Sequence, residues 1–160
     1  MDLVRAQVER VIGTSGQDYA VVLRAENKSF LIFVGQPEVV AIFRELHDES
    51  VQRPMPHDVV ANVIRAFDIE IRLIVISSIV ESVFCATLLL ARQRADATDG
   101  IEKDEVRLDL RASDAMILAL KTHNPLWVAR DVLDQVEDVT PALPAEDDDS
   151  EDSSGEEEDP

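Results

Sequence analysis

The chain has 160 residues, 46% of them apolar and only 4% aromatic, which suits one domain with an aliphatic core. The formal net charge is −18, and residues 1–136 alone, with 21 acidic residues against 15 Lys and Arg, carry −6, so the sequence shows no broad basic surface of the kind by which proteins usually bind nucleic acid. Any such site must therefore be a local cluster or one compensated by divalent metal. The one cysteine, Cys85, rules out an internal disulfide and is typical of a reducing compartment.

The negative charge is concentrated at the C-terminal end. Residues 137–160 hold 12 of the 33 acidic residues and none of the 15 Lys and Arg. We therefore predict a domain over 1–136, followed by a disordered acidic tail over 137–160 that is suited to contact a basic partner. The chain shows neither the apolar core of a signal peptide nor an apolar run of about 18 residues, so we expect a cytoplasmic protein without a membrane partner.

The first third of the chain predicts strands. Residues 4–11 alternate between apolar and polar, and the apolar runs 19–23 and 29–34 flank a polar turn at 26–28. This pattern is typical of a strand followed by a β-hairpin.

Two helices are predicted next. Apolar residues recur at helical spacing over 37–46 and, after a loop at 48–54, from residue 56 onward. The second helix is amphipathic, with one apolar face opposite Asp58, Asn62 and Arg65. That face consists of Val59, Val60, Val63, Ile64 and Phe67.

The second half predicts further strands and one buried helix. Residues 69–80 and 83–92 read as long strands joined by a turn at 81–82, and 105–111 alternates after a polar loop at 95–104. A helix over 115–120 is apolar on all sides and is therefore expected to be buried. A short strand at 126–128 and a helical turn at 131–136 complete the predicted elements.

This order of elements predicts an α+β fold, a mixed and mostly antiparallel sheet with three or four helices packed on it. Strands and helices do not alternate as in a doubly wound parallel sheet. The strand over 69–80 is apolar enough to be buried on both faces, so we also predict a homo-oligomer, most simply a dimer.

Three polar segments are candidates for chemistry, residues 53–58, residues 109–114 and the turn 35–38 that leads into the first predicted helix. One interpretation is structural: Ser113 is a suitable N-cap, Asp58 and Asp114 complement helix dipoles, and His57 is a surface residue. The other brings His57, Asp58, Asp109 and Asp114 together, so that an imidazole and carboxylates ready a water for attack on a phosphodiester, with a divalent ion such as Mg²⁺ or Mn²⁺.

In that interpretation basic residues near the carboxylates hold the phosphate. Arg53 and Arg111 are the candidates for phosphate contact, and we add Ser113 to the substrate-binding set. The tentative metal ligands are His57, Asp58 and Asp114. The sequence contains no HExxH metal motif and no Gly-rich phosphate loop. The spacing of residues therefore identifies neither a metal site nor a phosphate site.

These segments resemble the bifunctional nuclease domain family, small bacterial proteins with plant relatives credited with DNase and RNase activity. Residues 35–42 are similar to the family's G-x-x-E-A-x-A-I, 53–59 to R-P-x-T-H-D-L and 84–88 to F-x-A-x-L. Residues 109–115 look like D-A-R-P-S-D-A, and 125–128 like P-I-Y-V. The resemblance covers roughly residues 3–136.

The resemblance implies a nuclease on an α+β fold, without a mechanism that can be carried over. The sequence departs from the family pattern at Val39, Pro56 and Ala112, where Ala, Thr and Pro are usual; Pro56 removes a hydroxyl. We therefore predict hydrolysis of phosphodiester bonds in DNA or RNA. The alternative is a binding or regulatory module that keeps the fold without catalysis.

Overall fold

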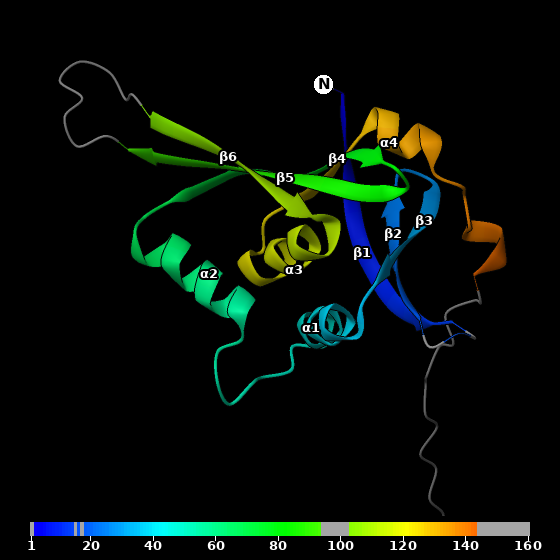
Figure 1. Ribbon diagram of the computed structural model, residues 1–160, viewed down its shortest axis with the longest axis horizontal. Helices are drawn as coiled ribbons and strands as arrows, with labels where there is room; N and C mark the ends of the chain where they lie inside the picture. Colours follow the sequence, from blue (N-terminus) through cyan, green and yellow to red (C-terminus); the bar gives the residue numbers. More distant parts are fainter. Residues whose placement is uncertain (1, 15, 17, 94–102, 144–160) are drawn as a thin grey trace, which may run out of the picture.

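A computed structural model describes residues 2–14, 16, 18–93 and 103–143 of the chain (Figure 1). The described residues form one seven-stranded sheet in the order β3-β2-β1-β7-β4-β5-β6. Only β4 and β7 are parallel, and all other neighbours are antiparallel. The strands are β1 (Leu3–Gly13), β2 (Tyr19–Ala25), β3 (Lys28–Val34), β4 (Glu70–Val80), β5 (Val83–Gln93), β6 (Lys103–Arg111) and β7 (Leu126–Ala129).

The short strand β7 joins two antiparallel three-stranded units. Its residue Leu126 pairs with Ala6 of β1 on one side and with Ile74 of β4 on the other. In the β4–β5 hairpin, Glu81 and Ser82 both have positive φ, 50° and 67°, which matches the twist that a two-residue hairpin turn requires. The predicted α+β class and the predicted hairpins are confirmed.

Four α-helices pack on the sheet or on each other within the described residues. They are α1 (Gln36–Leu46), α2 (Pro56–Ala66), α3 (Ala112–Thr122) and α4 (Arg130–Gln135), and a 3-10 turn follows at Thr140–Ala142. The helix α3 contacts β4, β5, β6 and β7, while α1 and α2 both pack against α3. Figure 1 shows α3 between the sheet and the other two helices.

The burial of α3 confirms the prediction of a buried helix. Ala115, Met116 and Ile117 are fully buried on successive sides of the helix, because the sheet covers one side and the neighbouring helices cover others. The polar residues of α3 therefore lie at its N-terminus, directly after β6, and on the side that faces α1 and α2.

The predicted apolar face of α2 is only partly buried. Val59, Val63 and Phe67, on this face, are 51%, 47% and 62% exposed, and within α2 only Ala61 and Ile64 are buried. The main contact of α2 is with α3, and packing against one helix needs only a narrow stripe of side chains.

The centre of β4 is covered within one chain. Ile74, Val75 and Ile76 are at most 2% exposed, so a second subunit is not needed to bury them. The homo-oligomer remains a prediction, but burial of this strand no longer supports it. None of the helices in the described residues is long and apolar enough to cross a membrane.

Residues 137–143, at the start of the predicted tail, contact the sheet. The Ser29 backbone N–H donates to Asp138 Oδ1 at 3.2 Å and Thr140 Oγ1 at 3.0 Å, and Val139 N donates to Ser29 O at 2.8 Å. This segment therefore runs along the edge strand β3. The rest of the predicted disordered tail, 144–160, and residues 95–102 of the predicted loop 95–104 lie outside the described residues.

Candidate functional site

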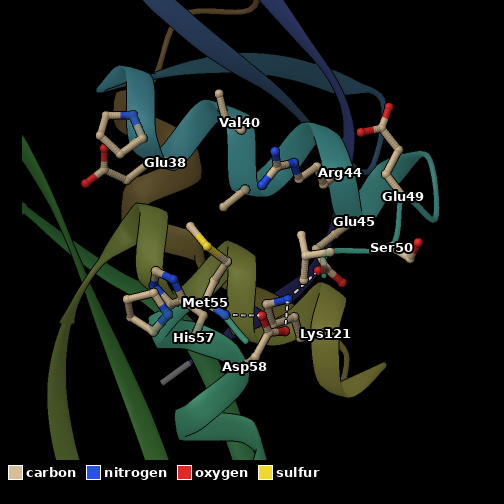
Figure 2. Close-up of a pocket in the computed structure, with 14 residues that line it drawn as sticks. Glu38, Val40, Arg44, Glu45, Glu49, Ser50, Met55, His57, Asp58 and Lys121 are labelled. Atoms are coloured by element: carbon tan, nitrogen blue, oxygen red, sulfur yellow. Dashed lines mark hydrogen bonds and ion pairs between the residues drawn. The ribbon is translucent and has the colours of Figure 1, made fainter. Parts of the chain in front are cut away.

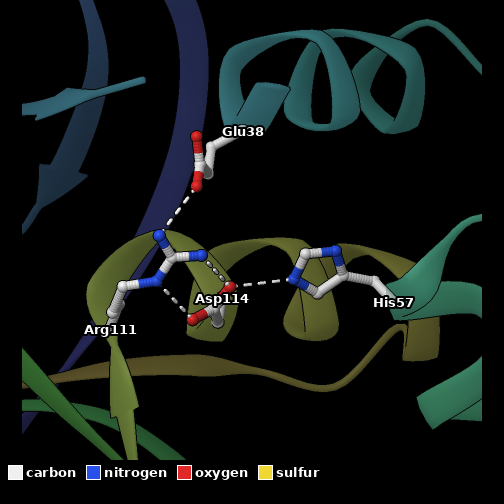
Figure 3. Close-up of polar contacts among 4 residues, drawn as sticks. All are labelled: Glu38, His57, Arg111 and Asp114. Carbon is white, nitrogen blue, oxygen red and sulfur yellow. Dashed lines mark hydrogen bonds and ion pairs between the residues drawn. The ribbon is translucent and has the colours of Figure 1, made fainter. Parts of the chain in front are cut away.

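The first polar cluster forms where β6 runs into α3. Arg111 ends the strand and is the N-cap residue of the helix, so its side chain lies close to the first turn of that helix. Its Nε and Nη2 donate to the two carboxylate oxygens of Asp114 at 2.8 and 2.9 Å, and Nη1 donates to Glu38 of α1 at 2.8 Å (Figure 3). The guanidinium thereby ties α1 to the start of α3.

His57, at the start of α2, completes this cluster. Its Nε2 lies 2.9 Å from Asp114 Oδ1 (Figure 3), and both side chains are 21% exposed. The Arg111 hydrogen bonds lower the pKa of Asp114 more than burial raises it, and the His57 contact lowers it further. An ionised carboxylate only accepts hydrogen bonds, so Nε2 carries the shared hydrogen. The other nitrogen, Nδ1, has no hydrogen-bond partner among the described residues.

A second cluster lies two helical turns further along α1 and α3. Lys121, whose side chain is 11% exposed, donates to Glu45 of α1 and to Asp58 of α2. Burial lowers the pKa of Lys121, but the hydrogen bonds to Asp58 and Glu45 outweigh it and the pKa is raised. The hydrogen bond from Lys121 lowers the pKa of Asp58, whose other oxygen accepts Met55 N at 2.7 Å.

The two clusters lie at a cavity of about 350 Å³ between α1 and α2 (Figure 2). His57, Asp58 and Lys121 contribute to its lining, while the walls are mainly aliphatic. The full lining is Pro37, Glu38, Val40, Ala41, Arg44, Glu45, Glu49, Ser50, Val51, Met55, Pro56, His57, Asp58 and Lys121.

The structure brings together His57, Asp114 and Arg111 and separates them from two other predicted residues. Asp58 follows His57 directly, yet its carboxylate is held by Lys121. Asp109 is exposed on β6, opposite Thr87 of β5, and lines none of the cavities described here. A centre containing all four predicted groups is therefore not observed.

The predicted substrate-binding residues are placed differently from one another. Arg53 is exposed in the loop before α2, without an ion pair to the described residues, and Ser113 is 9% exposed. Ser113 is also not the N-cap, because α3 begins one residue earlier at Ala112, after Arg111.

Glu45 and Lys121 are site residues that the sequence reasoning missed, whereas Glu38 lies in the polar segment 35–38 but was given no role there. Their signal is the spacing: Glu38 and Glu45 are seven residues apart on α1, as Asp114 and Lys121 are on α3. Seven residues are about two helical turns, so each pair faces the same side of its helix. The spacing alone does not reveal that the two helices face each other.

The predicted metal ligands do not converge on one point. No group of three or more His, Cys, Asp and Glu side chains in the described residues is arranged to hold an ion. Both oxygens of Asp114 accept hydrogen bonds from Arg111, and Asp58 is held by Lys121, so these carboxylates already have cationic partners. The donor set as arranged does not fit a three-ligand site.

Comparisons with known proteins identify the family. The chain is 30% identical over 141 residues to bifunctional nuclease 2 of Oryza sativa subsp. japonica, covering 83% of this chain and 41% of the rice protein. It is 27% identical over 136 residues to an uncharacterized protein of Mycobacterium tuberculosis, covering 84% of this chain and 76% of that protein. The chain thus spans about two fifths of the rice relative.

The model of the bifunctional nuclease domain matches residues 21–140, which include α1, α2, α3 and both polar clusters. This match covers far more than half of the chain and confirms the resemblance seen in the sequence motifs. The chain belongs to the bifunctional nuclease domain family.

Proposed function

We propose that the chain hydrolyses phosphodiester bonds of nucleic acid, with His57 as general base and Asp114 as the residue that orients it. The observation that carries this proposal is the 2.9 Å contact of Nε2 with Asp114, which leaves Nδ1 unpaired at a cavity. A histidine oriented by a carboxylate through one nitrogen is suited to accept a proton through the other.

In the proposed reaction Nδ1 of His57 accepts a proton from a water molecule. The water oxygen forms a bond to phosphorus, the P–O bond to the leaving group breaks, and the leaving oxygen takes a proton from solvent. Arg111 uses three of its five N–H donors on Asp114 and Glu38, so two remain for a phosphate oxygen. Arg53, exposed in the preceding loop, is the second proposed phosphate contact.

The test measures cleavage of single-stranded DNA and of RNA by the wild type and the variants His57→Ala and Asp114→Asn. We expect each variant to lose about 10²- to 10⁴-fold in rate, the usual contribution of a general base. The double variant should lose little more, since the two side chains act as a unit. Circular dichroism checks that the fold survives.

Asp131→Asn is the matched control, because Asp131 is also an acid in the first turn of a helix, α4, and is exposed away from the cluster. It should keep wild-type activity. Cleavage that persists in both site variants would refute the roles of His57 and Asp114. Parallel reactions with Mg²⁺, Mn²⁺ or chelator test the separate prediction of a divalent cofactor.

A non-catalytic module is the second candidate, and one observation favours it. Each cluster joins α1, α2 and α3, and its carboxylates all have basic partners, as expected of a network that only fixes helix positions. On this alternative Asp114→Asn lowers stability, and no cleavage above that of a mock preparation is found.

A further inference from the structure

The walls of the cavity between α1 and α2 expose apolar side chains. Val40 on α1 is 40% exposed, and Met55, just before α2, is 44% exposed. Ala41 adds to the α1 wall, and Figure 2 shows the Met55 side chain reaching toward α1. Burying such surface stabilises a complex, so the walls fit a ligand with an apolar body.

The charged residues of the lining leave one cation, Arg44, to contact a negative group of a ligand. Lys121 is engaged by Glu45 and Asp58, and Glu38 is engaged by Arg111. Arg44 is the cation of the lining that has no side-chain partner among the described residues. Figure 2 shows Arg44 projecting from α1 beside Val40, near the apolar walls. The unpaired acid of the lining, Glu49, is exposed.

We propose that this cavity binds one unpaired nucleotide of a single strand, with the base between Val40 and Met55 and a phosphodiester on Arg44. The inference rests on the proposed phosphodiesterase function and names its substrate class. Every nucleobase has an apolar face, and the methionine sulfur makes favourable contacts with aromatic rings. A phosphodiester carries one negative charge, which a single unpaired arginine matches.

The size of the cavity excludes a duplex. About 350 Å³ is at the lower end of the range for small-ligand sites, enough for one base and its sugar but not for stacked base pairs. A paired base must leave its stack to enter, which adds a cost that an unpaired base does not have. Binding of a single strand should therefore exceed binding of a duplex of the same sequence.

The experiment measures the affinity of the full chain for a short fluorescent oligothymidylate with phosphorothioate linkages, which keep the charge and resist hydrolysis. Arg44→Ala should weaken binding about tenfold, the loss expected of one charge-assisted contact. Ala41→Trp, which fills the cavity, should weaken it at least as much. Arg65→Ala and Ala66→Trp are the controls, because both residues are exposed on α2 outside the cavity and should leave the affinity unchanged.

Each outcome separates this inference from the proposed reaction. Absence of binding by the wild type up to about 1 mM, or equal affinity in wild type, Arg44→Ala and Ala41→Trp, would overturn the inference. Binding that follows the expected pattern without any cleavage would leave it standing and remove the proposed reaction. Octanoate, like a nucleotide, combines an apolar body with one negative group, and it serves as the competitor. If octanoate binds the cavity and the oligonucleotide does not, the site takes apolar carboxylates and the inference is wrong.

Discussion

The two polar clusters are built on the same three helices yet end in different states. In the first, Arg111 is 65% exposed and one nitrogen of His57 has no partner among the described residues. In the second, Lys121 is only 11% exposed and lies between two carboxylates. Both clusters take one acid from α1 and one group from the start of α2.

Because of this difference, the proposed chemistry is assigned to the first cluster. Asp58 and Asp114 both occupy the third position of their helices, α2 and α3. Both carboxylate oxygens of Asp58 accept hydrogen bonds, one from Lys121 as an ion pair and one from the Met55 N–H as a helix cap. These contacts fix the start of α2. Asp114 contacts Nε2 of His57, whose Nδ1 has no partner among the described residues. Equivalent positions thus have a structural role at Asp58 and a proposed chemical role at Asp114.

The largest expected difference between the two clusters is the loss of folding stability when the cation of each is removed. Lys121→Met leaves Asp58 and Glu45 near each other without a counter-charge, and we expect unfolding to become easier by about 2 kcal/mol. This is less than for a fully buried pair because the two carboxylates are 23% and 24% exposed. Arg111→Met should cost about 1 kcal/mol or less, since water screens an exposed guanidinium. Urea denaturation measures both, and a larger loss for Arg111→Met would contradict this ranking.

The two clusters should also differ in how their contribution to stability depends on pH. The lowered pKa values of Asp58 and Asp114 contribute stability above pH ~3.9, the unfolded value, which is lost as pH falls through the folded pKa. The raised pKa of Lys121 contributes stability below pH ~10.4, which is lost as pH rises through the folded pKa.

The loss of folding stability at alkaline pH should therefore come from the second cluster, which contains Lys121. Lys121→Met should reduce the loss of stability above pH ~10.4, whereas Arg111→Met should keep it, because the pKa of Arg111 is raised further beyond that range. Thermal unfolding at pH values on both sides of this limit measures the effect. Identical alkaline profiles for Lys121→Met and the wild type would count against it.

Salt gives the smallest expected difference. Added salt screens exposed charges more than buried ones, so the stability gap between the wild type and Arg111→Met should shrink as salt rises. The corresponding gap for Lys121→Met should change less, since its ammonium is nearly buried. Urea titrations at low and high NaCl compare the two gaps, and a salt-independent gap for Arg111→Met would show that its contacts are not screened.

Much of the fold could be predicted because it depends on local pattern. The alternation in 4–11, the hairpin turns and the all-round apolar helix each depend on residues close in sequence, and the strands and helices follow them closely. The candidate site was predictable in part. Two charged segments pointed to His57 and Asp114, but their 2.9 Å contact joins residues 57 positions apart.

The sequence alone predicted most of the helices and strands, the α+β class, the family and three of the segments that carry polar groups, 35–38, 53–58 and 109–114. The tertiary structure alone decided how α1, α2 and α3 face one another, and hence which acid has which partner. It gave Asp58 to Lys121, Asp114 to His57 and Arg111, and left Asp109 exposed. The physical reason is that side-chain periodicity fixes the face of each helix, whereas the neighbour of that face follows from packing of the whole chain.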